Sequence, residues 1–118
     1  MKTILVVDDE WAIAEVLESL LSDEGYRVII ANNGKQALER LGEWPPDLIM
    51  MDFMMPVMDG RATLAALQSD PKTAAIPVIV MSSLPEQTIA ERCTGYVVFL
   101  RKPFRVAAVL DAVESALR

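Results

Sequence analysis

The chain has 118 residues, of which 53% are hydrophobic, and its formal net charge is −6. This length fits one domain with a buried core, and the acidic balance disfavours direct binding to nucleic acid. With no histidine and a single cysteine, the sequence excludes histidine-based catalysis, histidine or thiolate metal cages and an internal disulfide, so any bound metal would be a hard cation held by oxygen.

Short β-branched runs alternate with amphipathic segments along the chain, and this alternation predicts an α/β fold with a parallel sheet covered on both sides. Strands are expected at Ile4–Val7, Tyr26–Ile30, Leu48–Met51, Pro77–Met81 and Tyr96–Leu100. Helices are expected at Trp11–Glu24, at Lys35–Leu41, from Asp59–Gly60 to about Gln68, from Ser83–Glu86 onward, and at Val106–Leu117. The expected architecture is a doubly wound five-stranded sheet with five helices, in the strand order 2-1-3-4-5, which leaves the uncharged end of the second strand at an edge.

Individual residues mark several of the expected helix ends. Gly25 is a C-terminal stop for the first helix, and Asp59 is an N-cap for the third. Ser83 and Glu86 have the spacing of a capping box, so a helix is expected to start there. The lone Cys93 is expected to be a small buried hydrophobic residue.

The apolar segments are too short to cross a membrane. A spanning helix needs about 20 consecutive apolar residues, whereas the longest stretch without a charge, Thr73 to Pro85, is shorter and contains prolines. The first apolar run stops at Asp8, which a signal peptide would not do. We therefore expect a soluble protein of the cytoplasm.

Polar side chains stand at most of the predicted strand ends. Asp8 and Asp9 follow the first strand, Asp52 the third, Ser82 the fourth and Lys102 the fifth. In an open parallel sheet, ligands bind beyond the carboxyl ends of the strands. These side chains are therefore expected to converge on one crevice.

The converging groups predict phosphoryl chemistry. Carboxylates that lie close together repel one another unless a cation lies among them, and oxygen ligands suit Mg²⁺, which often binds carboxylates together with a phosphate. Lys102 would balance one phosphoryl oxygen and Ser82 would donate to another, which supplies the positioning and neutralisation that phosphoryl transfer needs. A carboxylate nucleophile such as Asp52 would yield an acyl phosphate. Each residue alone is more often a loop residue, a cap or a solvated charge. The prediction therefore depends on all of them occurring together at the strand ends.

Four segments resemble, in chain order, the receiver domain of bacterial response regulators. They are ILVVDDE at 4–10, DFMMPVMDG at 52–60, which is similar to the family's phosphoacceptor pattern D-x-x-M-P-x-M-D-G, IPVIVMS at 76–82 and KPF at 102–104. The resemblance covers the whole chain. It implies one receiver domain over residues 1–118 with the flavodoxin-like fold, acting as a phosphoacceptor switch that promotes its own phosphorylation and dephosphorylation rather than as an enzyme.

The resemblance implies a metal-dependent acceptor site. Asp52 would accept a phosphoryl group from a phosphohistidine on a sensor histidine kinase, or from a phosphotransfer protein. Asp9, Asp52 and the backbone carbonyl of Met54 would hold Mg²⁺, with Mn²⁺ as a substitute, and Asp8 would assist mainly through water.

The resemblance also implies a switch. Lys102 would contact the phosphoryl group, and the Lys102–Pro103 peptide bond would be cis. Ser82 would move toward a phosphoryl oxygen and Phe99 would turn inward, which couples the site to the surface of helix 4, strand 5 and helix 5. A downstream target, an output domain or a second copy in a homodimer would read that surface. Without the resemblance, Phe99 is equally an ordinary strand aromatic.

The region between Ser82 and Lys102 departs from the family pattern. Its spacing is slightly shorter than usual, so the fourth helix is expected to be trimmed or reshaped. The segment Gly95–Phe99 is more apolar than usual. Deeper burial of this strand is favoured over an exposed dimer or partner interface.

Three further positions carry expectations of their own. Met54 and Leu84 follow the acceptor and hydroxyl residues, where the family governs access of hydrolytic water. Neither side chain orients water well, so a long-lived aspartyl phosphate is expected. Trp11 lies next to the acidic residues and is expected to report Mg²⁺ binding, or else to be a core aromatic of the first helix.

Two other functions would require different residues after the first strand. A flavin- or nucleotide-binding module would need a phosphate loop rich in Gly, Ser or Thr after the first strand, and an aspartyl phosphatase similar to the dehalogenase family would carry D-x-D there. The chain has Asp8-Asp9-Glu10 at this place. A receiver-like interaction module without phosphoryl turnover stays open as the alternative, as does the question of whether the domain acts alone or within a longer chain.

Overall fold

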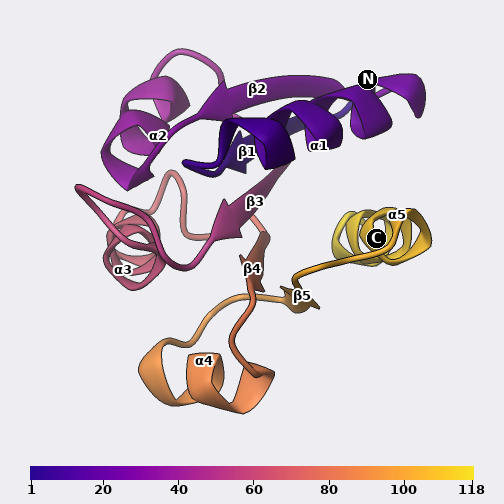
Figure 1. Cartoon of the computed structure of the whole chain (residues 1–118). Helices are drawn as coiled ribbons and strands as arrows, with labels where there is room; N and C mark the ends of the chain where they lie inside the picture. The colour runs from indigo at the N-terminus through magenta and orange to yellow at the C-terminus, as the bar shows by residue number, and fades with distance from the viewer.

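A strand and a helix alternate five times along the chain in the computed structural model, which describes residues 1–118 (Figure 1). The strands are β1 (Thr3–Val7), β2 (Arg27–Ala31), β3 (Leu48–Asp52), β4 (Val78–Ser82) and β5 (Val98–Arg101). The helices are α1 (Trp11–Asp23), α2 (Gly34–Leu41), α3 (Gly60–Ser69), α4 (Glu86–Arg92) and α5 (Val106–Ala116). None of these helices combines the length and apolar character that crossing a membrane requires.

The strands form one parallel sheet in the order β2-β1-β3-β4-β5, which confirms the predicted fold class and order. The register aligns the carboxyl ends of the strands. Val7 at the end of β1 pairs with Met51, and Asp52 at the end of β3 pairs with Met81. The residues at the ends of β1, β3 and β4, and those directly after them, therefore lie at one edge of the sheet.

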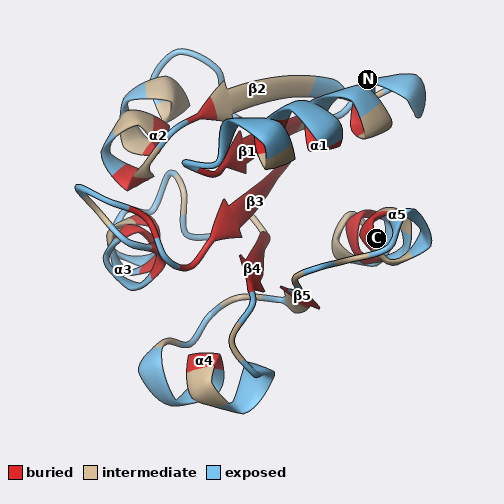
Figure 2. Cartoon of the chain, viewed as in Figure 1, coloured by how far each residue is buried: buried red, intermediate tan, exposed pale blue.

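The sheet separates two apolar layers, because alternate residues of each strand point to opposite faces. One layer packs against α1 and α5 and the other against α2, α3 and α4. The first contains Ile4, Val6, Leu48, Met50, Ile79 and Met81, and the second contains Leu5, Val7, Ile49, Met51, Val78 and Val80. Strands buried on both faces explain the continuous apolar runs in the sequence, and β3 and β4 are buried along their whole length (Figure 2).

Two of the predicted helix ends are confirmed. The N–H of Gly25 donates to the Ser22 carbonyl and the N–H of Tyr26 to that of Leu21, and Gly25 has a φ of +91°. This is the Schellman ending of a helix, which favours glycine at the left-handed position. The carboxylate of Asp59 accepts a hydrogen bond of 2.8 Å from the Ala62 N–H and so caps α3.

The region after β4 corrects two expectations. Helix α4 has only 7 residues, as the short spacing indicated, but Pro85 precedes it and no side chain caps it, so the predicted capping box is wrong. Cys93 is half-buried against the second apolar layer rather than fully buried.

The apolar segment before and within β5 is not deeply buried. Val97 is 56% exposed, Tyr96, Val98 and Phe99 are half-buried, and only Leu100 is buried. The expectation of deeper burial was therefore wrong. The reason is the topology, because β5 is an edge strand with a neighbouring strand on one side only.

Candidate functional site

Lys102 lies among three carboxylates at the carboxyl edge of the sheet. Its Nζ atom is 2.9 Å from Oδ2 of Asp8, 3.3 Å from Oδ1 of Asp52 and 3.5 Å from Oε1 of Glu10. Asp8 and Asp52 are both buried, whereas the Glu10 side chain is 60% exposed. The sheet thus brings together residues that are far apart in the sequence, as the strand-end argument predicted for Asp8, Asp52 and Lys102.

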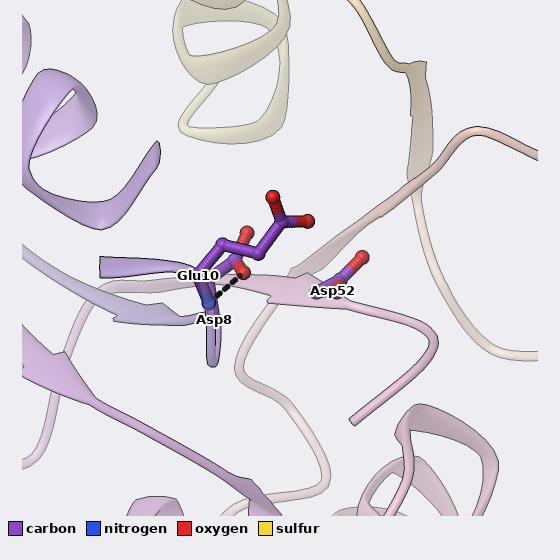
Figure 3. A group of neighbouring side chains, drawn as sticks. All are labelled: Asp8, Glu10 and Asp52. Atoms are coloured by element: carbon purple, nitrogen blue, oxygen red, sulfur yellow. Dashed lines mark hydrogen bonds between the residues drawn. The ribbon is translucent and has the colours of Figure 1, made fainter. Parts of the chain in front are cut away.

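The turn after β1 sets the directions of the acidic residues. The Glu10 N–H donates to Oδ1 of Asp8 at 2.9 Å, so the chain folds back over the Asp8 side chain and the Glu10 carboxylate reaches over the site (Figure 3). Carboxylate oxygens of Asp8, Glu10 and Asp52 all lie within 4.8 Å of one another. Asp9 is exposed and lies outside this group.

Glu10 is the residue that sequence reasoning missed. The signal was present, since Glu10 continues the acidic run Asp8-Asp9-Glu10, but strand-end position alone gave it no role. Which member of such a run turns inward is decided by the backbone of the turn, and that depends on the hydrogen bond between the Glu10 N–H and Asp8.

The site raises the pKa of its acidic and basic groups in different ways. Burial first, and then the nearby charge of Asp8, raise the pKa of Asp52 to about 6 against the opposing charge and hydrogen bond of Lys102. Asp9 contributes to the same rise as the smallest of these effects. For Lys102, burial opposes the charged form, but the hydrogen bond to Asp8 and the charge of Asp52 outweigh it and raise its pKa.

These electrostatics fit a divalent cation. Buried carboxylates whose ionisation is opposed by desolvation and mutual repulsion gain from a second positive charge. The carbonyl oxygen of Met54 accepts no hydrogen bond within the chain, so it is a free acceptor beside the site. Asp9 and Met54 border the same surface hollow. An all-oxygen donor set of this kind suits Mg²⁺.

The loop between β3 and α3 is held close to the acceptor strand. The Gly60 N–H donates to the Phe53 carbonyl at 2.8 Å. A Cβ atom at Gly60 would lie 2.8 Å from the Phe53 Cα and 3.1 Å from the Asp52 carbonyl oxygen. Only glycine allows this approach, which explains the Asp59-Gly60 pair at the start of α3.

The two predicted switch residues lie on neighbouring strands. Ser82 is buried at the end of β4, and its hydroxyl accepts a hydrogen bond of 3.1 Å from the Leu84 N–H. Phe99 lies on β5, pairs in register with Val80 and packs half-buried against the second apolar layer. The Lys102–Pro103 peptide bond is cis. Trp11 is 77% exposed, so it is not a core aromatic.

Comparisons with known proteins identify the family of the chain. The family model described as response regulator receiver domain matches residues 4–114. The chain is 39% identical over 116 residues to the transcriptional regulatory protein ZraR of Escherichia coli. The aligned region covers 97% of this chain but 26% of that protein. It is 35% identical over 119 residues to the response regulator GtcR of Aneurinibacillus migulanus, of which it covers 48%. The chain thus spans half or less of these relatives.

Solved structures share the fold over nearly the whole chain. The Vibrio cholerae chemotaxis response regulator CheY4 has a TM-score of 0.91 at 28% identity, covering 99% of both chains. The receiver domain of the sensor histidine kinase PA1611 from Pseudomonas aeruginosa also has a TM-score of 0.91 at 28% identity, covering 98% of this chain and 97% of that one, and its structure holds a magnesium ion coordinated in the active-site cleft. With the family model matched from strand β1 to helix α5, this chain belongs to the response regulator receiver domain family.

Proposed function

We propose that this chain is a phosphoacceptor switch in which Asp52 takes a phosphoryl group from a sensor histidine kinase or a phosphotransfer protein. The observation that carries the proposal is the buried Asp52 carboxylate, 3.3 Å from the Lys102 ammonium at the carboxyl edge of the sheet. A carboxylate oxygen of Asp52 would form a bond to phosphorus as the phosphorus–nitrogen bond of a phosphohistidine breaks. Lys102 would neutralise a phosphoryl oxygen, which is the contribution that phosphoryl transfer asks of a protein.

The reaction would depend on Mg²⁺, or on Mn²⁺ as a substitute. Asp52, Asp9 and the carbonyl oxygen of Met54 would hold the ion, with Asp8 acting mainly through water. When bound, the metal would neutralise charge on the phosphoryl group and on the carboxylates. Support comes from the raised pKa of Asp52, because the burial and the charge of Asp8 that raise it disfavour the ionised carboxylate, which a bound cation would stabilise.

The signal would pass to the surface of α4, β5 and α5. Ser82 would release the Leu84 N–H and donate to a phosphoryl oxygen, and Phe99 would move further inward from its half-buried position. Val97 and Val106 are exposed apolar side chains next to this surface. A downstream protein, an output domain or a second copy of the chain in a homodimer would bind there.

In this account the chain is a switch and not an enzyme acting on a separate substrate. Its net charge of −6 disfavours direct contact with nucleic acid, so its partners are proteins. We place its action in the cytoplasm, where the phosphohistidine donors would meet it.

The acceptor residue can be mapped chemically. After incubation with acetyl phosphate and Mg²⁺, borohydride reduction would convert an aspartyl phosphate to homoserine, which peptide mass spectrometry assigns to a position. We expect the modified residue to be Asp52, with none in Asp52→Asn. Homoserine at Asp8 or Asp9 instead would refute the assignment. An absence of any modified residue would favour the receiver-like interaction module that does not turn over phosphate.

A further inference from the structure

A small cavity, separate from the carboxylate site, lies where α3 meets the end of α4. Its volume is about 190 Å³. It is lined by Arg61, Leu64, Ala65, Gln68, Arg92, Cys93 and Thr94. The walls come from α3 and from the segment that follows the short helix α4, so this cavity is separate from the carboxylates around Lys102.

Two unpaired positive charges border the cavity. Arg61 and Arg92 make no hydrogen bond and no ion pair within the chain, and no acidic residue lines the cavity. The chain has 17 acidic and 11 basic residues. A cavity bordered by basic residues and by no acidic ones is therefore unusual for a chain with a net negative charge. Guanidinium groups that share a cavity repel one another, and an anion between them removes this repulsion.

The acidic residues of the adjoining hollow do not form an ion pair with Arg92. Asp9 and Asp59 border the adjoining hollow, which Arg92 also lines, yet neither forms an ion pair with it. The Asp59 carboxylate instead accepts the Ala62 N–H at the start of α3. Arg92 is therefore left available to a ligand.

The other walls keep the cavity in shape. The Gln68 amide donates to the Thr94 carbonyl at 3.1 Å and ties α3 to the segment after α4. A Cβ atom at Gly95 would overlap this amide, so the glycine permits the close approach. Burial and the charge of Asp59 raise the pKa of the half-buried Cys93 thiol, and the charge of Arg61 opposes the rise. The side chains of Arg61, Arg92 and Thr94 lie exposed at the rim of the cavity.

The size of the cavity limits the ligand to one small group. Pockets for whole drug-sized molecules have volumes of roughly 300–1,000 Å³, and this cavity is smaller. Planar guanidinium groups match the paired oxygens of phosphate and carboxylate. We propose that Arg61 and Arg92, with the Thr94 hydroxyl, form a binding site for a phosphate or carboxylate group between α3 and α4. This proposal does not depend on phosphoryl acceptance by Asp52.

The test is a titration of the ¹⁵N-labelled full chain without Mg²⁺, at constant ionic strength, followed by NMR. Inorganic phosphate and acetate are the probes, and the side-chain Nε–H signals of the arginines and the backbone amide of Thr94 are the readout. The variants are Arg61→Gln and Arg92→Gln. Arg105→Gln is the matched control, because Arg105 is an exposed arginine away from the cavity.

We expect a saturable shift of the Arg61, Arg92 and Thr94 signals that both cavity variants weaken about tenfold, a typical loss for a charged hydrogen bond, and that Arg105→Gln leaves unchanged. Saturation with phosphate alone identifies a phosphate site, and saturation with acetate identifies a carboxylate site. The proposal is overturned if neither probe saturates, if the cavity variants bind as the control does, or if only Asp52 and Lys102 respond.

Discussion

Val57 has the least favourable backbone of any residue in the loop after Asp52. Its φ is +69°, and the Met58 N–H donates to the Pro56 carbonyl at 2.7 Å, so a three-residue turn is closed around a β-branched residue. Such a conformation costs on the order of 1–3 kcal/mol in a non-glycine residue. The Val57 side chain is 78% exposed, so it recovers little of this cost by packing.

Replacing Val57 by asparagine should stabilise the protein. Asparagine tolerates positive φ better than valine, so Val57→Asn is expected to raise the free energy of unfolding by about 1 kcal/mol in urea denaturation. Val97→Asn is the control, since Val97 is also exposed but has no positive φ. Equal effects of the two substitutions would show that the turn is not strained.

Asp52 makes the metal-free protein sensitive to pH. Its pKa is about 6 in the folded protein and 3.8 is the ordinary value, so the folded state holds this proton more tightly. The stabilising contribution is complete below about pH 4 and is lost as the pH rises through about 6. A rise of this size corresponds to about 3 kcal/mol at 1.36 kcal/mol per pKa unit.

The substitution Asp52→Asn should therefore stabilise the protein at pH 7 in a chelating buffer, by about 1–3 kcal/mol once the lost contact with Lys102 is allowed for. The advantage should shrink as the pH falls from 7 and disappear below about pH 4, where Asp52 becomes protonated in both states. Urea unfolding at several pH values measures it, with Asp111→Asn on the exposed face of α5 as the control. A difference that is constant with pH, or a less stable variant at pH 7, would contradict this reading.

Met54 bears on the lifetime of the proposed aspartyl phosphate. Its side chain is 60% exposed beside the site and offers hydrolytic water only a weak acceptor. Met54→Asn, which adds a group able to orient water, is expected to speed loss of the phosphoryl group by about tenfold, a modest part of what a positioned polar group contributes. The decay of the phosphorylated mass with time reports the rate. Equal rates for the two proteins would count against a long-lived phosphate caused by Met54.

At the scale of elements, the approach of α3 to β3 depends on Gly60. A Cβ atom there would press on the backbone of Phe53 and Asp52, which has no room to yield. Gly60→Ala is expected to lower the free energy of unfolding by about 1–3 kcal/mol, as overpacking does. Gly42→Ala is the matched control, since an added Cβ would meet only the Glu39 carbonyl oxygen at 3.5 Å and the φ of Gly42 is −69°. Thermal or urea unfolding that ranks the two substitutions equally would refute the steric argument.

Elements with strong periodicity could be predicted from the sequence, and weakly marked ones could not. The fully buried β3 and β4 show as apolar runs, and the ends at Gly25 and Asp59 follow from local chemistry that tertiary structure did not override. The predicted capping box of α4 is wrong because Pro85 takes the N-cap position, so the Ser83 hydroxyl does not cap the helix. The exposure of Val97 depends on its place next to the edge strand β5, and no local pattern contains that information.

At the scale of the whole molecule, strand order decides which parts of the site were foreseen. Asp8, Asp52 and Lys102 meet because a parallel sheet aligns the carboxyl ends of its strands, and that much follows from their positions in the chain. That Glu10 rather than Asp9 lies close to Asp8 and Asp52 depends on one turn, which the sequence did not reveal. The cavity between α3 and α4 also depends on tertiary placement, since Arg61 and Arg92 are unremarkable surface residues in sequence.

The most direct test of the account is the intact mass of the protein after incubation with acetyl phosphate, with and without Mg²⁺, for the native chain and for Asp52→Asn. We expect a gain of one phosphoryl group, about 80 Da, in the native chain only when Mg²⁺ is present, and no gain in the variant. No gain under any condition, or an equal gain in Asp52→Asn, would contradict the claim that Asp52 is the phosphoacceptor of this receiver domain.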